Sequence, residues 1–221
     1  MKHTKRFAKT MLIVPAAIGF IAFVTLMAGL GGFYRAGSIP YEEGHIVVYM
    51  CPENNCEQII ISELNRAENY IHCAFYNLAL DSVKSVLENK STAVEVKTVT
   101  GRDRKSRRGI MHNKFCVIDS RRVITGSANP TKSIGRDMNN IVVIDSGIIA
   151  KNYEEEFKEL DEGIFGGGKP TRIRKVNLSG IIVENYFCPE DGCEAALSNM
   201  LASATDNSKF MTFSFTSWLI G

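Results

Sequence analysis

The chain has 221 residues, of which 45% are hydrophobic and 23% are charged, and its formal net charge is +2. This balance is ordinary for a globular protein long enough to bury a sizeable core, and it excludes a disordered, low-complexity chain. The small net charge says little about partners, so the distribution of charge along the chain carries more information.

The N-terminal part of the chain has the pattern of a membrane anchor. Residues 11–30 contain no charged side chain and, as a helix, could cross a bilayer core of about 30 Å. Residues 1–10 are basic without any acidic side chain, which predicts a cytoplasmic N-terminus and an extracytoplasmic remainder. A cleaved signal peptide begins in the same way, but its apolar region usually has about 7 to 15 residues. We therefore expect a single-pass anchor in preference to a signal peptide.

Residues 31–45 contain glycines and are mixed in polarity, which predicts a linker that includes His45. The folded part is expected to begin at Ile46. From there the spacing of apolar residues predicts strands over 46–50, 70–78, 93–99, 115–118, 121–125 and 141–144, and helices over 56–68, 81–89 and 149–160. Strands and helices in this order indicate an α/β domain with a covered sheet.

Two of these strands form a hairpin within residues 111–131. His112 and Lys114 lie two positions apart at its start, so both side chains would project from the same face. A turn at Asp119 would then bring the second strand back, and the polar loop behind it would return to the neighbourhood of His112. The loop residues with a chemical role are Gly126, Ser127 and Asn129.

This set contains a nucleophile or base in His112, a cation in Lys114 and neutral hydrogen-bonding groups in Ser127 and Asn129. Gly126 allows the backbone to approach a ligand closely. The combination suits a tetrahedral oxyanion such as a phosphodiester.

A basic run over residues 102–108 ends four residues before His112. Its arginines could hold the backbone of a polyanion and would make binding dependent on salt. The alternative is a solvated loop without a binding role, and Arg121 and Arg122 are interpreted as surface charge. The candidate substrate-binding arginines are Arg104, Arg107 and Arg108.

The cysteines form two closely spaced pairs, each with four intervening residues: Cys51 with Cys56 and Cys188 with Cys193. In an exported protein each pair could oxidise to a disulfide. Zinc binding by the four thiols is the alternative, although their spacing is wide for it. Cys73 and Cys116 lie in apolar strands and are expected to be inert core residues.

An internal repeat is visible around the two cysteine pairs. Residues 46–57 align with 183–194 and share Tyr, Cys, Pro, Glu, Cys and Glu in register. This alignment predicts a first lobe over 46–165, a joint over 166–182 and an incomplete second repeat over 183–221.

The spacing His112-x-Lys114-x4-Asp119, followed after six residues by Gly126-Ser127-x-Asn129, resembles the signature of the phospholipase D superfamily. The resemblance implies a mixed sheet flanked by helices and a phosphohistidine intermediate formed by His112. Lys114, Ser127 and Asn129 would stabilise the negative oxygens, while Asp119 would mainly hold local structure. No metal or other cofactor is expected.

The chain departs from the family pattern in three respects. It contains one such motif where relatives use two, so a homodimer or a further lobe would have to supply the second histidine, the general acid. Asn139 stands where many relatives have a Glu that orients the nucleophile. The segment between Val99 and His112 is also shorter than in relatives.

We therefore expect a membrane-anchored phosphodiesterase whose catalytic lobe is extracytoplasmic. The basic run favours nucleic acid as the substrate. A phospholipid hydrolase or headgroup transferase is the first alternative, because an anchor would keep the site near lipid. A non-catalytic phosphate-binding lobe is the second, because the second motif is missing.

Overall fold

The computed structural model describes residues 38–101, 105–106, 109–209 and 212. The expected basic N-terminus and membrane anchor, together with Arg104, Arg107 and Arg108, lie outside these residues. Within the described part, no helix has the length and apolar character that a bilayer crossing requires.

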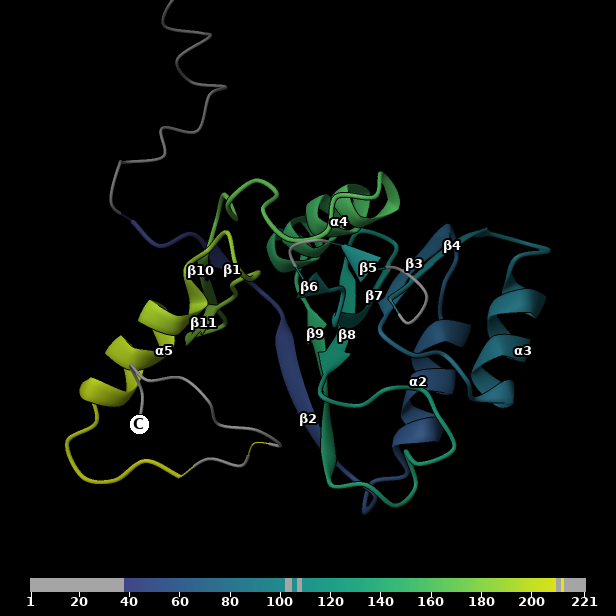
Figure 1. The fold of residues 1–221 in the computed structure, drawn as a ribbon, viewed down its shortest axis with the longest axis horizontal. Coiled ribbons are helices and arrows are strands. Elements are labelled where there is room, and N and C mark those ends of the chain that lie inside the picture. Colours follow the sequence, from purple (N-terminus) through teal and green to yellow (C-terminus); the bar gives the residue numbers. More distant parts are fainter. Residues whose placement is uncertain (1–37, 102–104, 107–108, 210–211, 213–221) are drawn as a thin grey trace, which may run out of the picture. The chain divides into compact units, whose positions relative to one another are not determined.

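A six-stranded mixed sheet forms the centre of the fold (Figure 1). Its strands lie in the order β2 (His45–Cys51), β9 (Asn139–Asp145), β8 (Arg122–Gly126), β7 (Lys114–Ile118), β3 (Tyr70–Phe75) and β4 (Glu95–Thr100). β3 and β4 are parallel, and the other neighbours are antiparallel. The short strands β5 (Lys105–Ser106) and β6 (Gly109–Ile110) form a separate hairpin before β7.

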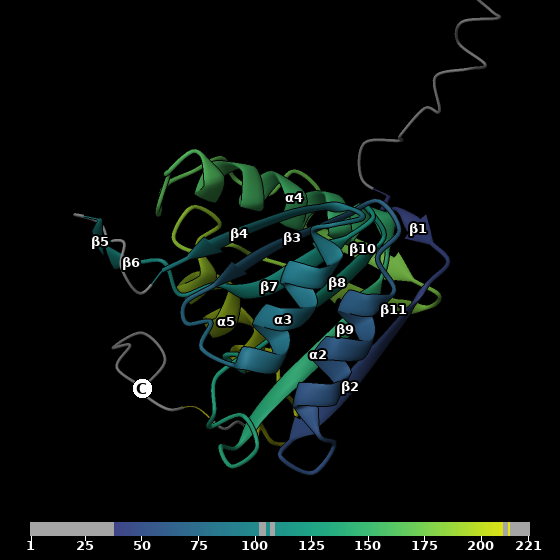
Figure 2. The ribbon, with the colours of Figure 1, turned by 90° about the vertical axis from the view of Figure 1, so that its right-hand side faces the viewer.

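Helices cover both faces of this sheet (Figure 2). The helices α2 (Cys56–Asn65) and α3 (Asp81–Lys90) share one hydrophobic cluster with Cys116 and Ile118 of β7. The helix α4 (Gly147–Asp161) shares the other cluster with Phe115 and Val117, which point the opposite way from the same strand. The expected α/β fold with a mixed, helix-flanked sheet is therefore confirmed.

The expected linker and joint both contain strands. β1 (Tyr41–Glu42) pairs with β10 (Lys175–Leu178), which pairs in turn with β11 (Ile181–Glu184), and His45 begins β2. Glu42 also accepts hydrogen bonds from the Ser146 hydroxyl and from the Gly147 and Ile148 backbone N–H groups at the start of α4. The start of a helix leaves backbone N–H groups without partners, and Glu42 supplies partners for two of them. The segment that contains β1 is therefore part of the fold.

Arg121 and Arg122 are likewise more than surface charge. Arg121 forms ion pairs with Glu42 and Asp145, and Arg122 forms ion pairs with Glu63 and Asp145. The interpretation of these two arginines as plain surface charge is therefore wrong, since β8 and β9 lie side by side and place Asp145 opposite Arg122.

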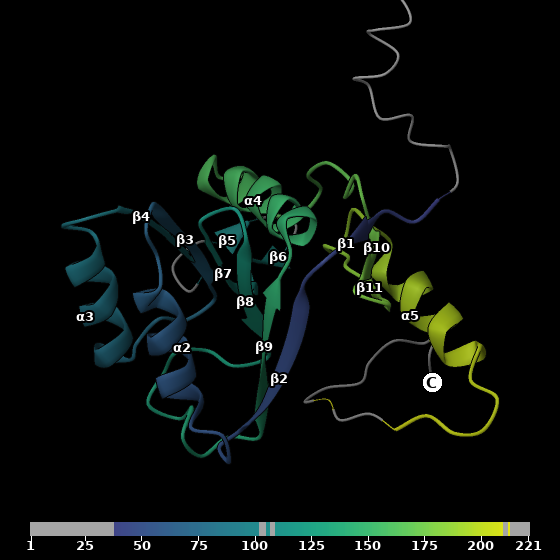
Figure 3. The same ribbon diagram turned by 180° about the vertical axis from the view of Figure 1, so that it is seen from behind.

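The two repeats form the same local structure. The loops Cys51–Cys56 and Cys188–Cys193 are each closed by a disulfide, which confirms both expected pairs. In each loop the residue before the helix has a positive φ, 49° for Asn55 and 66° for Gly192. A ten-residue helix follows in both cases, α2 in the first repeat and α5 (Cys193–Ala202) in the second. Figure 3 shows both of these helices, α2 and α5, from the side opposite to Figure 1.

Cys73 and Cys116 also form a disulfide. The expected place of both residues in the core is confirmed, since each is fully buried. The disulfide was not expected; it forms because β3 and β7 are neighbours and their register places Cys73 directly opposite Cys116.

Candidate active site

The hairpin of β7 and β8 brings the predicted site residues to one edge of the sheet. Phe115 pairs with Thr125, so the start of β7 and the end of β8 lie together. The next strand, β9, begins at the same edge with Asn139. The predicted return of the Gly126 loop to the neighbourhood of His112 and Lys114 is therefore confirmed.

Gly126 is required at the end of β8. Its φ is +135°, and a Cβ atom there would lie 2.4 Å from the Asn140 carbonyl oxygen. Any other residue would be strained and would clash with β9. The glycine thus lets the backbone of the loop lie against β9 at the site.

His112 and Lys114 form the cationic part of the site. The Lys114 ammonium donates a hydrogen bond to the His112 carbonyl oxygen over 2.8 Å and lies 5.8 Å from the centre of the Tyr76 ring. The Tyr76 ring meets the exposed His112 imidazole edge-on, with ring centres 4.8 Å apart. Tyr76 was not singled out in the sequence, although it directly follows β3.

The electrostatics of this pair favour a neutral imidazole. Partial burial, and secondly the Lys114 charge, lower the pKa of His112 below its ordinary value. Burial also lowers the pKa of Lys114 to about 8. At neutral pH the histidine can therefore act as a nucleophile while the lysine remains largely charged.

Ser127 and Asn139 bind each other. The Ser127 hydroxyl donates to the Asn139 side-chain oxygen over 2.9 Å and accepts from the Asn140 backbone N–H over 3.0 Å. The Asn139 oxygen, a candidate acceptor for the imidazole, is therefore engaged by Ser127. Among the described residues, no carboxylate forms a hydrogen bond with the His112 ring. Asn129 accepts from the Asn77 backbone N–H over 3.3 Å, which fixes its loop to the end of β3.

Asp119 lies at the far end of β7 from His112. Its carboxylate accepts hydrogen bonds of 2.8 Å from the backbone N–H groups of Glu68, Asn69 and Tyr70. Burial of the carboxyl acts to raise its pKa, but these hydrogen bonds prevail and hold the pKa below its ordinary value. This geometry agrees with a structural role for Asp119 and keeps it away from the reacting groups.

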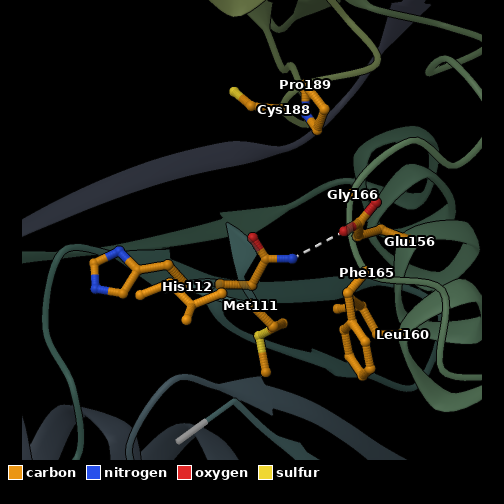
Figure 4. A pocket seen from close by; sticks show the side chains of 10 residues that line it. Met111, His112, Glu156, Leu160, Phe165, Gly166, Cys188 and Pro189 are labelled. Carbon is orange, nitrogen blue, oxygen red and sulfur yellow. Dashed lines mark hydrogen bonds between the residues drawn. The ribbon is translucent and has the colours of Figure 1, made fainter. Parts of the chain in front are cut away.

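Asn113 and Glu156 are site residues that sequence reasoning missed. The Asn113 side-chain N–H donates to a Glu156 carboxylate oxygen over 2.9 Å, on the wall of a pocket of about 90 Å³. In Figure 4 a dashed line marks this hydrogen bond to Glu156, and the His112 ring points away from Glu156. The pocket is also lined by Met111, Leu160, Phe165, Cys188 and Pro189.

The signal for Glu156 was its position on α4. It follows Ile149 by seven residues and precedes Leu160 by four, which places a carboxylate on the apolar stripe of an amphipathic helix. Burial, and next the neighbouring Glu190 charge, raise the pKa of Glu156 to about 7. A carboxyl group on that stripe has to find a polar partner, and Asn113 provides one.

Glu156 also belongs to a group of three carboxylates with Glu159 and Glu190, whose oxygens lie within 4.8 Å of one another. Glu159 accepts from the Lys169 backbone N–H, and Glu190 accepts from the Gly167 backbone N–H. Through these bonds Glu159 and Glu190 hold the loop that follows α4.

Comparison with known proteins agrees with the motif. Residues 82–160 match the family model described as "Cardiolipin synthase, PLD-like domain". The chain is 27% identical over 124 residues to a phospholipase D of Rickettsia typhi, which covers 46% of this chain and 61% of that protein. It is 42% identical over 55 residues to a mitochondrial cardiolipin hydrolase of Xenopus laevis, which covers 24% of this chain and 26% of that protein.

The chain therefore spans less than two thirds of the length of these curated relatives. Among solved structures, the phospholipase D family member Nuc from Salmonella typhimurium is 22% identical, with 52% of this chain and 93% of that chain covered and a TM-score of 0.47. The matched segment contains the whole His112 to Asn129 motif, so this part of the chain is similar to the phospholipase D-like domain.

Proposed function

We propose that the protein is a phosphodiesterase of the phospholipase D type in which His112 is the nucleophile. The observation that carries the proposal is the position of Lys114 beside His112: its ammonium binds the His112 carbonyl oxygen, its charge helps to lower the pKa of the imidazole, and both residues lie where β7 begins and β8 ends at Gly126. The lysine would stabilise the negative oxygens of the phosphodiester, as Ser127 and Asn129 would.

In the proposed reaction a ring nitrogen of His112 forms a bond to phosphorus while the bond from phosphorus to the leaving oxygen breaks. The leaving alkoxide takes a proton from a general acid, and water then hydrolyses the phosphohistidine. The other described histidines do not suit the acid role. His72 is bound to Glu95 and Glu154, and His45 begins β2 at the end opposite Asn139. The acid would therefore come from a second lobe or a second copy of the chain.

Nucleic acid is the proposed substrate because the arginines of residues 102–108 directly precede the site in sequence. Phospholipid is the second candidate, supported by the apolar segment 11–30 and by relatives that are named phospholipase D and cardiolipin hydrolase. In either case we place the catalytic lobe on the extracytoplasmic side of a membrane, tethered by residues 11–30.

The test uses the full chain purified in detergent. It would be incubated in parallel with a labelled single-stranded DNA oligonucleotide and with vesicles that contain a labelled phosphatidyl lipid. We expect DNA cleavage to exceed lipid cleavage, and His112→Ala to lower the rate by at least about 10³-fold because the nucleophile is lost. His45→Ala is the matched control and should retain the wild-type rate.

Full activity in the His112→Ala variant would contradict the assigned nucleophile. Faster cleavage of lipid would reverse the order of the two substrates. Phosphate binding without any turnover would support a non-catalytic lobe.

The pH dependence of kcat/KM tests the assigned charge states. His112 must be neutral, so the rate should rise with pH through a pKa below the ordinary histidine value of 6.5. Lys114 must be charged, so the rate should fall as pH rises through about 8. Lys114→Arg should move this alkaline fall to higher pH, since a guanidinium stays protonated. A fall that stays near pH 8 in this variant would assign it to another group.

A further inference from the structure

The residues that precede β7 lack the support of strand pairing. β6 ends at Ile110 and β7 begins at Lys114, so residues 111–113 lie outside both ladders. His112 is in the middle of this segment. Two hydrogen bonds hold the residue next to it: the Tyr76 backbone N–H donates to the Asn113 carbonyl oxygen over 2.8 Å, and the Asn113 side chain donates to Glu156 over 2.9 Å.

The direction of Asn113 also determines the direction of His112. In an extended segment, adjacent side chains point to opposite faces. The Asn113 side chain donates its hydrogen bond to Glu156 of α4. The His112 ring points away from Glu156 (Figure 4). On its own side the imidazole meets the Tyr76 ring. The bond to Glu156 therefore favours the orientation in which His112 lies with Tyr76 and Lys114.

A second contact makes α4 a firm support for this segment. Phe115, two residues beyond Asn113, packs edge-on against Tyr153 with ring centres 5.0 Å apart. Tyr153 lies three residues before Glu156, on the same side of α4. Phe157 and Leu160 of α4 are buried in the cluster beneath the sheet. The 113–115 segment is thus attached at two successive points to a packed helix.

We propose that Glu156 is a positioning residue for His112, which it orients through the side chain of Asn113. The expected effect on turnover rests on the proposed function. The contact itself does not, because it involves only Asn113, Glu156 and the segment between β6 and β7. Glu156 contributes an oxygen acceptor to this bond. An amide oxygen at the same place can accept the same hydrogen bond, so Glu156→Gln retains the support and Glu156→Ala removes it.

The kinetic test compares Glu156→Ala, Asn113→Ala, the double variant and Glu156→Gln in the full chain. Glu156→Ala and Asn113→Ala should each lower kcat by about 10- to 100-fold with little change in KM, because a misdirected nucleophile costs rate more than binding. The double variant should be no slower than either single variant, since both changes break one bond. Glu156→Gln should stay within about threefold of the wild-type kcat. Glu155→Ala, an exposed change on the same helix, is the matched control.

Wild-type kcat in both alanine variants would overturn the proposal, as would multiplicative losses in the double variant or equal losses in Glu156→Gln and Glu156→Ala. If Glu156→Ala does not fold, Asn113→Ala carries the same test, because Asn113 lies outside the strands and is only half buried.

A second readout is independent of turnover. The ¹³C NMR signals of the His112 ring, assigned by their loss in His112→Ala, report the contact of the imidazole with Tyr76. They should shift in Asn113→Ala, because the imidazole leaves the Tyr76 ring, and should keep the wild-type position in Glu156→Gln. An unmoved signal in Asn113→Ala refutes the positioning role even if the wild-type chain has no phosphodiesterase activity, which would be the failure of the proposed function alone.

Discussion

The two cysteine loops begin the two repeats and differ mainly in what surrounds them. In each loop a disulfide closes the turn, and the backbone N–H of Asn54 or Asp191 donates over 2.9 Å to the carbonyl oxygen of Met50 or Phe187. These matched contacts lie within a few residues of chain. A shared local sequence is therefore sufficient to produce the same loop twice.

The helices that follow the loops are buried to different extents. In α2, Ile60 and Leu64 are 3% and 0% exposed and pack with residues of β3. Leu197, which corresponds to Ile60 in α5, is 40% exposed, and α5 has no buried residue. The same ten-residue helix thus contributes to a core only where a sheet covers its apolar side, which α2 has and α5 lacks in the described part of the chain.

The residues just before the two loops show the opposite difference in burial: those of the second repeat are packed, and those of the first are more exposed. Phe187 packs against Tyr153 with ring centres 5.0 Å apart, and Asn185 accepts a hydrogen bond of 2.6 Å from Asn152. In the first repeat the corresponding Met50 and Val48 are 44% and 56% exposed. The second repeat is therefore attached to the first lobe through its strand end and loop, and its helix takes no part in the core.

The largest expected difference in the free energy of unfolding is between matching substitutions in α2 and α5. Leu64→Ala should lower the free energy of unfolding by about 2 to 5 kcal/mol, because it opens a cavity beneath the sheet. Leu201→Ala, the same change at the matching position of α5, should cost about 1 kcal/mol or less. Urea denaturation of the oxidised protein measures both values. Equal losses would mean that α5 packs as tightly as α2.

A smaller difference in the free energy of unfolding is expected between matching substitutions just before the two loops, at Phe187 and Met50. Phe187→Ala should lower the free energy of unfolding by about 2 kcal/mol, since it removes a half-buried ring and its contact with Tyr153. Met50→Ala should change it by about 0.5 kcal/mol or less because Met50 is largely exposed. The same denaturation experiment applies. A larger loss for Met50→Ala would show that a partner covers β2 in solution.

The smallest effect concerns the matching loop residues Asp191 and Asn54. Burial acts to raise the pKa of Asp191, but hydrogen bonds from Thr171 and from the Phe187 backbone, together with the Arg174 charge, hold it below its ordinary value. A lowered folded-state pKa adds stability above the unfolded value of 3.8 that is lost as pH falls through the folded value. Asp191→Asn should therefore be less stable than the wild type at pH 7, and the loss should be the smallest of the three comparisons.

The difference between Asp191→Asn and the wild type should narrow as pH falls below 3.8, because the unfolded-state carboxyl then takes up a proton while the folded one stays charged until its lower pKa is reached. Unfolding curves at pH 7 and pH 3 measure this change. Asn54→Asp in the first repeat is the control, because Asn54 is exposed in its loop. A difference that stays constant with pH would assign the stabilisation to packing of the side chain instead of its charge.

Features that depend on nearby residues were predictable from the sequence. The hairpin follows from two apolar runs and a turn, and it brings the start of β7 at Lys114 close to the end of β8 at Gly126. The disulfides of the two loops join cysteines five positions apart, so no knowledge of the sheet was needed. Alternation of strands and helices was likewise enough for the fold class, since each element buries its own apolar side.

Contacts between distant segments needed the tertiary structure. Cys73 and Cys116 are 43 positions apart, as are Asn113 and Glu156, and Glu42 reaches the start of α4 across more than 100 positions. In each case the partner depends on which strands are neighbours, in what register, and on which face a helix packs. Periodicity shows only that a side chain points inward. The sequence by itself therefore determined the local elements and the motif, whereas only the packed structure decided which distant residues hold His112 in place.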